Sequence, residues 1–306
     1  MLQLIADGLV VGSVVSLGAV GLTMTYAILR FANFAHGELL TWGAYLALTA
    51  LGILLAIGGS ARMVPLAPFS FGWELIAAGL VACVGAAGIA LALDRLLFSR
   101  LRHGAAITLV IASFGAALAL RNLLQFLWGP IPTYYTRELQ MAIPLVPRDV
   151  LGGMRITPDQ LLVLGLAAAT VVGLHLFLTR TTLGKAMRAT ALNPQLARVA
   201  GVDVDAVIRA TWIIGAVLAT VAGVLAGLTV QLRPQLGFDL LLPLFAAAIL
   251  GGIGNVYGAV LGGLIVGLAE SLAVPLIGAE YRAAVSFLVI IAILLVRPQG
   301  LLGERT

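Results

Sequence analysis

Polar and ionisable side chains gather in one short segment, NFAHGE, that lies between two long apolar runs. Asn33, His36 and Glu38 fall in this segment, and residues 9–28 before it and 39–57 after it are each long enough to cross a bilayer. Ionisable groups at membrane depth are costly, so they usually have a partner or a function. The spacing therefore indicates a helix, a short turn and a second helix, with either a capped turn or a polar site between them.

Two interpretations of this segment stay open. As a capped turn at the water interface, Asn33 caps the next helix and Glu38 favours the positive amino end of that helix. As a functional element, the segment is a polar site between the two spans.

No arrangement of residues typical of catalysis or metal binding occurs in the sequence. Gly184-Lys185 lacks the upstream Gly and the following Ser or Thr of a phosphate-binding loop, and HExxH and CxxC are absent. His36, His103 and His175 lie on three segments without metal-ligand spacing. We therefore predict no catalytic residue, no metal and no cofactor. If the chain does work against a gradient, the energy must come from ions or from another chain.

Composition places the chain in the membrane. Hydrophobic residues make up 61% of the 306 residues and charged residues only 10%, against about 25% in soluble domains. The 36 glycines suit closely packed transmembrane helices. The net charge of +5 is too small and too dispersed to indicate a nucleic-acid partner, and the single cysteine, Cys83, is expected to be a small packing residue.

The apolar runs predict an all-α polytopic membrane protein with about nine transmembrane segments. They lie near residues 5–28, 38–58, 73–98, 105–127, 160–179, 207–231, 240–253, 258–276 and 282–297. The seventh is short and contains Pro243, so it forms either a hairpin or a re-entrant pair with the eighth. The first has no basic residue ahead of it, which favours a transmembrane helix over a cleavable signal peptide. Basic residues are more frequent in the loops that lie inside when the amino terminus is outside and the carboxyl terminus inside.

Two longer loops interrupt the spans. Residues 129–158 are rich in proline and fall outside, as a surface for a partner; the family resemblance described below implies that this side is the periplasm. Residues 180–205 fall inside, and there Asn193, Pro194 and Gly201 have the positions of an N-cap, a first helical residue and a C-terminal glycine. They predict a short helix over residues 194–200, after a basic helical stretch. Such a helix is not stable alone in water, so the membrane domain or a cytoplasmic partner must hold it.

Two charges lie within apolar spans, Arg121 and Glu270. An unpaired buried charge costs several kcal/mol, so we predict an ion pair between them rather than direct contact with a substrate. Glycines repeat at four-residue spacing at Gly223/Gly227 and, three times, within residues 254–267. These repeats predict close helix packing, in the second case around the pathway.

The sequence also resembles the permeases of the high-affinity branched-chain amino-acid (hydrophobic amino-acid uptake) ABC importers. The resemblance covers nearly the whole chain. It is strongest in GLTMTYAILRFANFAHGELLTWGAY, LGKAMRATALNPQLARVAGVDVDAVI, AAILGGIGNVYGAVLGGLIVGLAE and the tail RPQGLLG, which follow one another in this order.

This resemblance implies a single permease domain over residues 1–306, in the bacterial inner membrane, with the many-helix (type II-like) importer fold. It implies a second related permease, two cytoplasmic ATPase subunits that hydrolyse ATP, and a periplasmic binding protein. The hairpin at residues 33–38 would form the inner gate beside the ATPases. The candidate gate and pathway residues are Asn33, Phe34, His36, Gly37, Glu38, Gly251, Gly252 and Gly254.

The inner loop would couple to the ATPases. The candidate coupling residues are Lys185, Arg188, Asn193, Pro194, Leu196, Ala197, Arg198 and Gly201.

The chain departs from the family pattern at Arg121, where an uncharged polar residue is usual. A guanidinium near the outer half of a span favours a ligand that carries a carboxylate. Branched-chain amino acids are the default substrate, with other amino acids, amides and urea carried by relatives. One alternative is a ribose-type sugar permease, but the NFAHGE segment argues against it. A second is an ion-coupled secondary transporter, for which Glu270 is the single supporting residue. A third is a membrane enzyme, but the sequence contains no nucleophile–base pair.

Overall fold

The structure is a computed structural model that describes residues 1–59, 63–102, 104–136, 140–146 and 153–303. Eight of the described helices are long and apolar enough to cross a membrane, and one shorter apolar helix accompanies them. The prediction of an all-α membrane protein with about nine segments is therefore confirmed. The helices that cross or enter the bundle are α1 (Leu2–Leu29), α2 (Ala35–Ile57), α3 (Trp73–Leu93), α5 (Ala106–Trp128), α6 (Pro158–Arg180), α9 (Val204–Thr229), α10 (Leu236–Gly251), α11 (Val256–Ile277) and α12 (Arg282–Val296).

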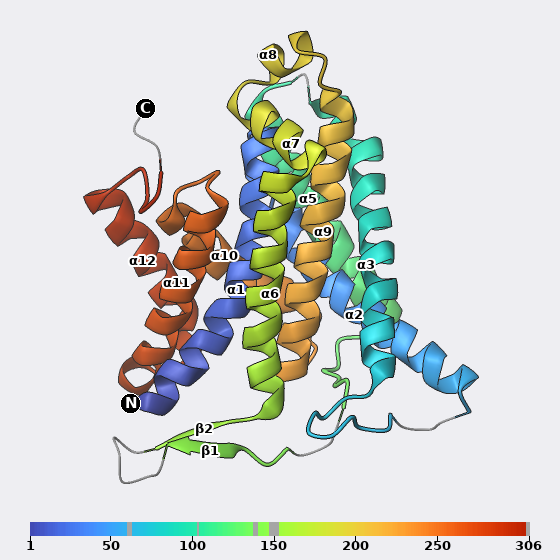
Figure 1. Cartoon of the computed structure of the whole chain (residues 1–306), viewed down its shortest axis with the longest axis vertical. Coiled ribbons are helices and arrows are strands. Elements are labelled where there is room, and N and C mark those ends of the chain that lie inside the picture. The colour runs from blue at the N-terminus through green and yellow to red at the C-terminus, as the bar shows by residue number, and fades with distance from the viewer. Residues whose placement is uncertain (60–62, 103, 137–139, 147–152, 304–306) are drawn as a thin grey trace.

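The two ends of the bundle carry different short elements (Figure 1). One end, here the α8 end, bears α7 (Thr182–Leu192) and α8 (Pro194–Val199), and η1 (Asp94–Phe98) and α4 (Ser99–Leu101) extend α3 toward it. The other, the ribbon end, bears strands β1 (Ile143–Val146) and β2 (Met154–Ile156), paired antiparallel, and η2 (Ala279–Tyr281) joins α11 to α12. The strands lie in the proline-rich loop, for which the sequence predicted no regular structure.

Local signals explain where several helices begin. Thr157 and Gln160 form a reciprocal capping box at the start of α6, with Pro158 as the first helical residue. Asp203 accepts a hydrogen bond from the Ala206 backbone at the start of α9, and Asn255 accepts one from Gly258 at the start of α11. Each cap satisfies backbone N–H groups that would otherwise be unpaired.

The centre of the bundle is packed through small residues. Helix α11 lies between α1 and α10, and a side chain at Gly267 would meet the backbone of Gly12, while one at Gly258 would meet the backbone of Gly251. The Ser16 hydroxyl donates to the Val260 carbonyl at 2.8 Å across the α1–α11 contact. The close packing predicted for the glycine repeats is therefore confirmed, because only glycine lets these backbones approach so closely.

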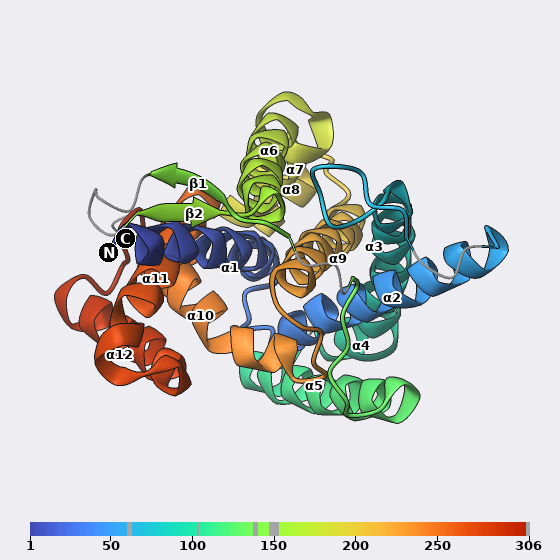
Figure 2. The same cartoon turned by 90° about the horizontal axis from the view of Figure 1, so that it is seen from below.

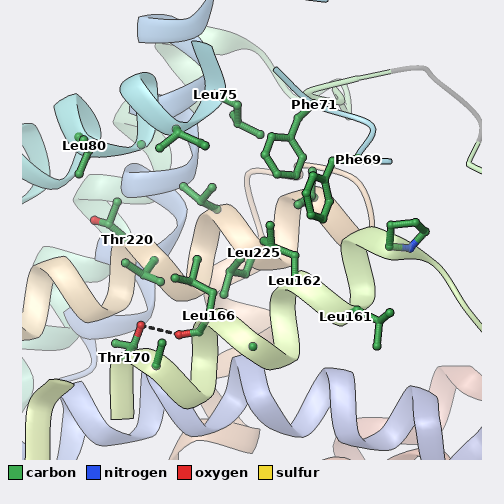
Figure 3. A pocket seen from close by; sticks show the side chains of 18 of the residues that line it. Phe69, Phe71, Leu75, Leu80, Leu161, Leu162, Leu166, Thr170, Thr220 and Leu225 are labelled. Atoms are coloured by element: carbon green, nitrogen blue, oxygen red, sulfur yellow. Dashed lines mark hydrogen bonds between the residues drawn. The ribbon is translucent and has the colours of Figure 1, made fainter. Parts of the chain in front are cut away.

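An apolar groove of about 860 Å³ lies between α3 and α6, with α9 as its floor (Figure 3). Its walls include Phe69, Phe71, Leu75 and Leu162, and its few polar side chains include Thr170, whose hydroxyl donates to a carbonyl of its own helix, and Thr220. Cys83 also lines it, as a packing residue would. No described residue of its lining carries a charge, so the groove matches the hydrocarbon of a bilayer and not a polar pathway.

Candidate functional site

The NFAHGE segment enters the bundle instead of turning at its surface. Helix α2 begins at Ala35, and the imidazole Nε2 of His36 forms a 3.0 Å hydrogen bond with the carbonyl of Gly18, near the middle of α1. Asn33, His36 and Glu38 are all buried. The interpretation as a turn at the water interface is therefore wrong for this segment, since the start of α2 packs against the centre of α1.

The helix-dipole part of that interpretation is confirmed for Glu38, but Asn33 is not the cap, because Phe34 is the N-cap of α2 and no side chain caps this helix start. The Asn33 side-chain oxygen accepts a hydrogen bond of 3.1 Å from the Ala35 backbone, and Glu38 lies in the first turn of α2, where a carboxylate interacts favourably with the helix dipole. The Asn33 amide nitrogen has no hydrogen-bond partner among the described residues.

Helices α2 and α10 touch backbone to backbone where both begin. A side chain at Gly37 would meet the Gly237 carbonyl, and one at Gly237 would meet the Gly37 carbonyl. The Gly237 N–H donates to the Thr41 hydroxyl at 2.8 Å. This crossing brings two helix amino ends, each a region of positive partial charge, to the same part of the bundle.

Arg121 of α5 pairs with Glu38 and not with Glu270. Its Nε and Nη2 both donate to Glu38 Oε1, at 3.1 and 2.8 Å. The carboxylate of Glu270 instead accepts a short hydrogen bond from the Ser286 hydroxyl of α12. The predicted Arg121–Glu270 pair is therefore wrong. The sequence left Glu38 open between a capped turn and a gate, and its burial against α5 depends on a tertiary contact that no local pattern shows.

Aromatic rings surround the start of α2. The Phe34 ring lies 5.1 Å from that of Phe245 on α10 and 6.0 Å from that of Phe114 on α5, between centroids. The Phe34 N–H donates to the Ser113 hydroxyl at 3.1 Å. The sequence reasoning found Phe34 but missed Phe114 and Phe245. A usable signal was present, since Phe114 lies seven residues, about two turns, before Arg121.

The three candidate pathway glycines lie at the α8 end, away from the Gly37–Gly237 crossing. Gly252 and Gly254 have positive φ values of 102° and 95°, which let the chain turn from α10 into α11 as a hairpin. The carboxyl-terminal tail closes over this turn, because the Leu301 N–H donates to Leu250 and the Leu302 N–H to Gly251, at 2.8 and 3.0 Å. The structure thus divides the predicted gate residues into two groups.

The short helix predicted over residues 194–200 is confirmed as α8, Pro194–Val199. The Asn193 side chain caps it by accepting from the Gln195 and Leu196 backbones, both at 3.0 Å. Gly201 has a φ of 84° just beyond its end. Of the eight candidate coupling residues only Ala197 is buried, and the rest are exposed at the α8 end.

A link joins this region to the start of α2. Arg30, between α1 and α2, donates from Nη2 to the Ala191 carbonyl of α7 at 2.5 Å. Arg30 has a φ of 60°, in the left-handed region, and its N–H caps α1 by donating to Tyr26 at 2.8 Å. Sequence reasoning assigned Arg30 no role beyond its charge.

The bundle of long apolar helices with its projecting α8 end defines a polytopic membrane protein. A model of the family described as "Branched-chain amino acid transport system / permease component" matches residues 4–294, and the chain belongs to this family. No group of three or more His, Cys, Asp or Glu side chains that could hold a metal ion occurs among the described residues.

Individual relatives match along almost their whole lengths. The chain is 33% identical to the high-affinity branched-chain amino acid transport system permease protein LivH of Escherichia coli, over 99% of this chain and 96% of the relative. It is 34% identical to BraD of Pseudomonas aeruginosa, with the same coverage, and 29% identical to a probable LivH of Methanocaldococcus jannaschii, over 98% and 92%. Among solved structures, PsaBC from Streptococcus pneumoniae aligns with a TM-score of 0.47 at 16% identity, over 96% of this chain and 91% of that one.

Proposed function

We propose that this chain is the translocation subunit of an ATP-driven importer that carries branched-chain amino acids. The names of the LivH and BraD relatives support this substrate class. The family match favours it over a ribose-type sugar permease and over an ion-coupled secondary transporter. The chain itself is non-catalytic in this proposal, and ATP hydrolysis belongs to separate subunits.

The proposed assembly contains a second related permease, most simply a different chain, two ATPase subunits and a periplasmic binding protein. The α8 end faces the cytoplasm of a bacterial inner membrane, and the ribbon end faces the periplasm. The amino terminus is then periplasmic and the carboxyl terminus cytoplasmic. The exposed basic side chains of Lys185, Arg188 and Arg198 at the α8 end support this orientation.

The observation that carries the proposal is the apolar surface of α8. Leu196 is 65% exposed and Val199 is 87% exposed at the tip of the molecule (Figure 1). A helix this short gains its stability from packing and capping and not from propensity, and two exposed apolar side chains on it are suited to a groove on a partner. The ATPase subunits are the partner that this family of importers requires.

Movement of α8 has a direct route to the start of α2. α8 follows α7 after the single residue Asn193, and the Arg30 side chain holds the last turn of α7 through Ala191. Arg30 precedes Phe34 and His36 by a few residues of non-helical chain. A displacement of α8 by the ATPases would therefore pull on the segment that places Phe34 between α5 and α10.

Replacing Leu196 with Asp tests the proposal. The reconstituted importer is expected to lose leucine uptake and the ATPase subunits to detach, while the permease stays in the membrane, because a charge replaces an exposed apolar contact. Uptake of labelled leucine and co-purification of the ATPases are the measurements. Gln195→Asp is the matched control, since it adds the same charge to an exposed polar neighbour on α8.

Normal uptake by Leu196→Asp would refute the coupling role of α8. Ala197 is a poor position for this test, because it is buried and a bulky charged residue there would disrupt the packing of α8 itself.

A further inference from the structure

One face of the bundle exposes charged side chains where the neighbouring spans expose apolar ones. Arg121 on α5 is 15% exposed, and Asp239 and Arg233, at and before the start of α10, are 47% and 43% exposed. The outer faces of α3, α6 and α12 instead expose leucine, isoleucine and valine. Charged groups are costly against hydrocarbon, so the α5–α10 face lines a wet path or an assembly contact. We call these three residues with Glu38 the charged layer.

The Arg121 guanidinium is fixed in position, but not all of its hydrogen-bond donors have an acceptor among the described residues. Its carbon lies 4.0 Å above the centre of the Phe238 ring, and Glu38 binds its Nε and Nη2. Its Nη1 donates to no acceptor among the described residues, and Glu38 Oε2, though buried, also lacks a partner there. This ion pair therefore keeps one donor, Arg121 Nη1, and one acceptor, Glu38 Oε2, that no described residue binds.

Asp239 completes a charge-balanced group. Its carboxylate lies 3.5 Å from Arg233 Nη2, and Asp239 directly follows Phe238, whose ring stacks on the Arg121 guanidinium. Two guanidinium groups and two carboxylates carry no net charge. A ligand that is itself neutral overall, with one charge of each sign, enters such a group without leaving an unpaired charge, whereas an anion or a cation would leave one.

A layer of rings lies beside the charged layer, toward the α8 end. Phe245 follows Phe238 by seven residues on α10, and Phe114 precedes Arg121 by seven on α5, so each pair lies on one helix face about 10 Å apart. Phe34 packs against both inner rings. The apolar surface needed for a hydrocarbon side chain is thus adjacent to the charged layer.

We propose that the charged layer is a transit site for zwitterionic amino acids within the translocation path. The substrate carboxylate binds Nη1 of Arg121, its ammonium group binds the Asp239 carboxylate, and its hydrocarbon side chain contacts Phe238 and the rings of Phe34 and Phe245. Glu38 is a positioning residue that fixes the guanidinium. This inference rests on the proposed function, and it excludes neutral amides and urea as ligands of this layer.

Protection of a cysteine from alkylation tests the site. Leu118 is exposed on α5, on the face shared by Phe114 and Arg121. In the assembled importer without ATP, a Cys83→Ala/Leu118→Cys chain is treated with N-ethylmaleimide in the presence of leucine, leucinamide or 4-methylpentanoate. Leucinamide lacks the carboxylate and 4-methylpentanoate lacks the ammonium group. At a leucine concentration of about ten times its dissociation constant, alkylation is expected to slow about tenfold, and the two analogues are expected not to slow it.

Two further variants and one control complete the test. Asp239→Asn, and Arg121→Gln together with Glu38→Gln, are each expected to abolish protection. The double change avoids leaving a buried Glu38 unpaired. In a Cys83→Ala/Met141→Cys chain, alkylation of this position, which is 93% exposed at the ribbon end, reports whether leucine acts elsewhere, and its rate is expected not to change.

Absence of protection in an importer that still takes up leucine would overturn the transit site and leave the proposed function standing. Equal protection by leucinamide or by 4-methylpentanoate would also overturn it, since one charged group would then suffice. An importer that takes up no leucine in any form would instead refute the proposed function.

Discussion

The Arg121–Glu38 pair joins α5 to the first turn of α2 through a buried carboxylate. The Glu38 side chain is only 2% exposed, so Arg121→Met leaves a buried carboxylate without its partner. We expect Arg121→Met to lower the free energy of unfolding by about 3 kcal/mol, as measured on the purified chain in detergent.

The Arg121→Met/Glu38→Met double variant is expected to cost less than the sum of the two single changes, because the two side chains act as a unit. The exposed pair of Arg209 and Asp203, at 3.9 Å, provides the control. Arg209→Met should change stability by about 1 kcal/mol or less. Strictly additive costs for Arg121 and Glu38 would show that their contact contributes nothing.

Sequence reasoning at this scale recognised the unusual charges but chose the wrong partners. Arg121 and Glu270 stood out because both lie inside apolar spans, whereas Glu38 lay beside Asn33 and Gly37, which are typical of turns. Depth in the membrane follows from how α2 packs against α1 and α5. That packing is a tertiary property, which the hydrophobic pattern along the chain does not encode.

Arg30 connects two helical elements, because it lies between α1 and α2 and its side chain binds the Ala191 carbonyl in the last turn of α7. Its φ of 60° suits glycine better than any other residue. Arg30→Gly therefore removes the hydrogen bond to Ala191 without straining the end of α1. We expect this variant to fold and to hydrolyse ATP in the assembled importer, but to take up at most about one tenth as much leucine per ATP, a loss equivalent to about 1.4 kcal/mol of coupling.

The measurement is the ratio of leucine imported to ATP hydrolysed in proteoliposomes. Arg95→Gly, in the π-helical segment η1, is a comparison that removes a basic side chain from the same end of the bundle. An unchanged ratio for Arg30→Gly would show that the Arg30–Ala191 hydrogen bond does not transmit movement.

Elements whose ends depend on local chemistry were predicted well. The short helix was placed within one residue, because Asn193, Pro194 and Gly201 act on their immediate neighbours. The start of α2 was placed three residues late, at 38 instead of Ala35. The strands β1 and β2 were missed, since their pairing joins two short segments with no strong alternation.

At the scale of the whole molecule, composition and apolar run length were enough to predict the fold class and the number of spans. They were not enough to predict that α2 and α10 cross at Gly37 and Gly237, or that α5 meets both of them. The spans have similar hydropathy, so a hydropathy profile does not distinguish them. Which helices pack together is determined by small residues, ring contacts and buried hydrogen bonds. Figure 2 shows the result, with α5 beside the start of α10 and far from α12.

The shortness of α10 has an electrical consequence. Its 16 residues extend about 24 Å, less than the roughly 30 Å of bilayer hydrocarbon, and Arg233 and Asp239 at its start are 43% and 47% exposed. Water in the proposed path would reach these two side chains, and the membrane voltage would then fall mainly between the charged layer and the α8 end. A single charge driven through this thin region would do about 2.3 kcal/mol of work per 100 mV, but a leucine zwitterion does none.

Leucine import at saturating ATP is therefore expected to be independent of an imposed potassium diffusion potential in proteoliposomes. An import rate that rises with an inside-negative voltage would show that a cation travels with the substrate. The electric field across the short α10 would then act on this co-transported cation.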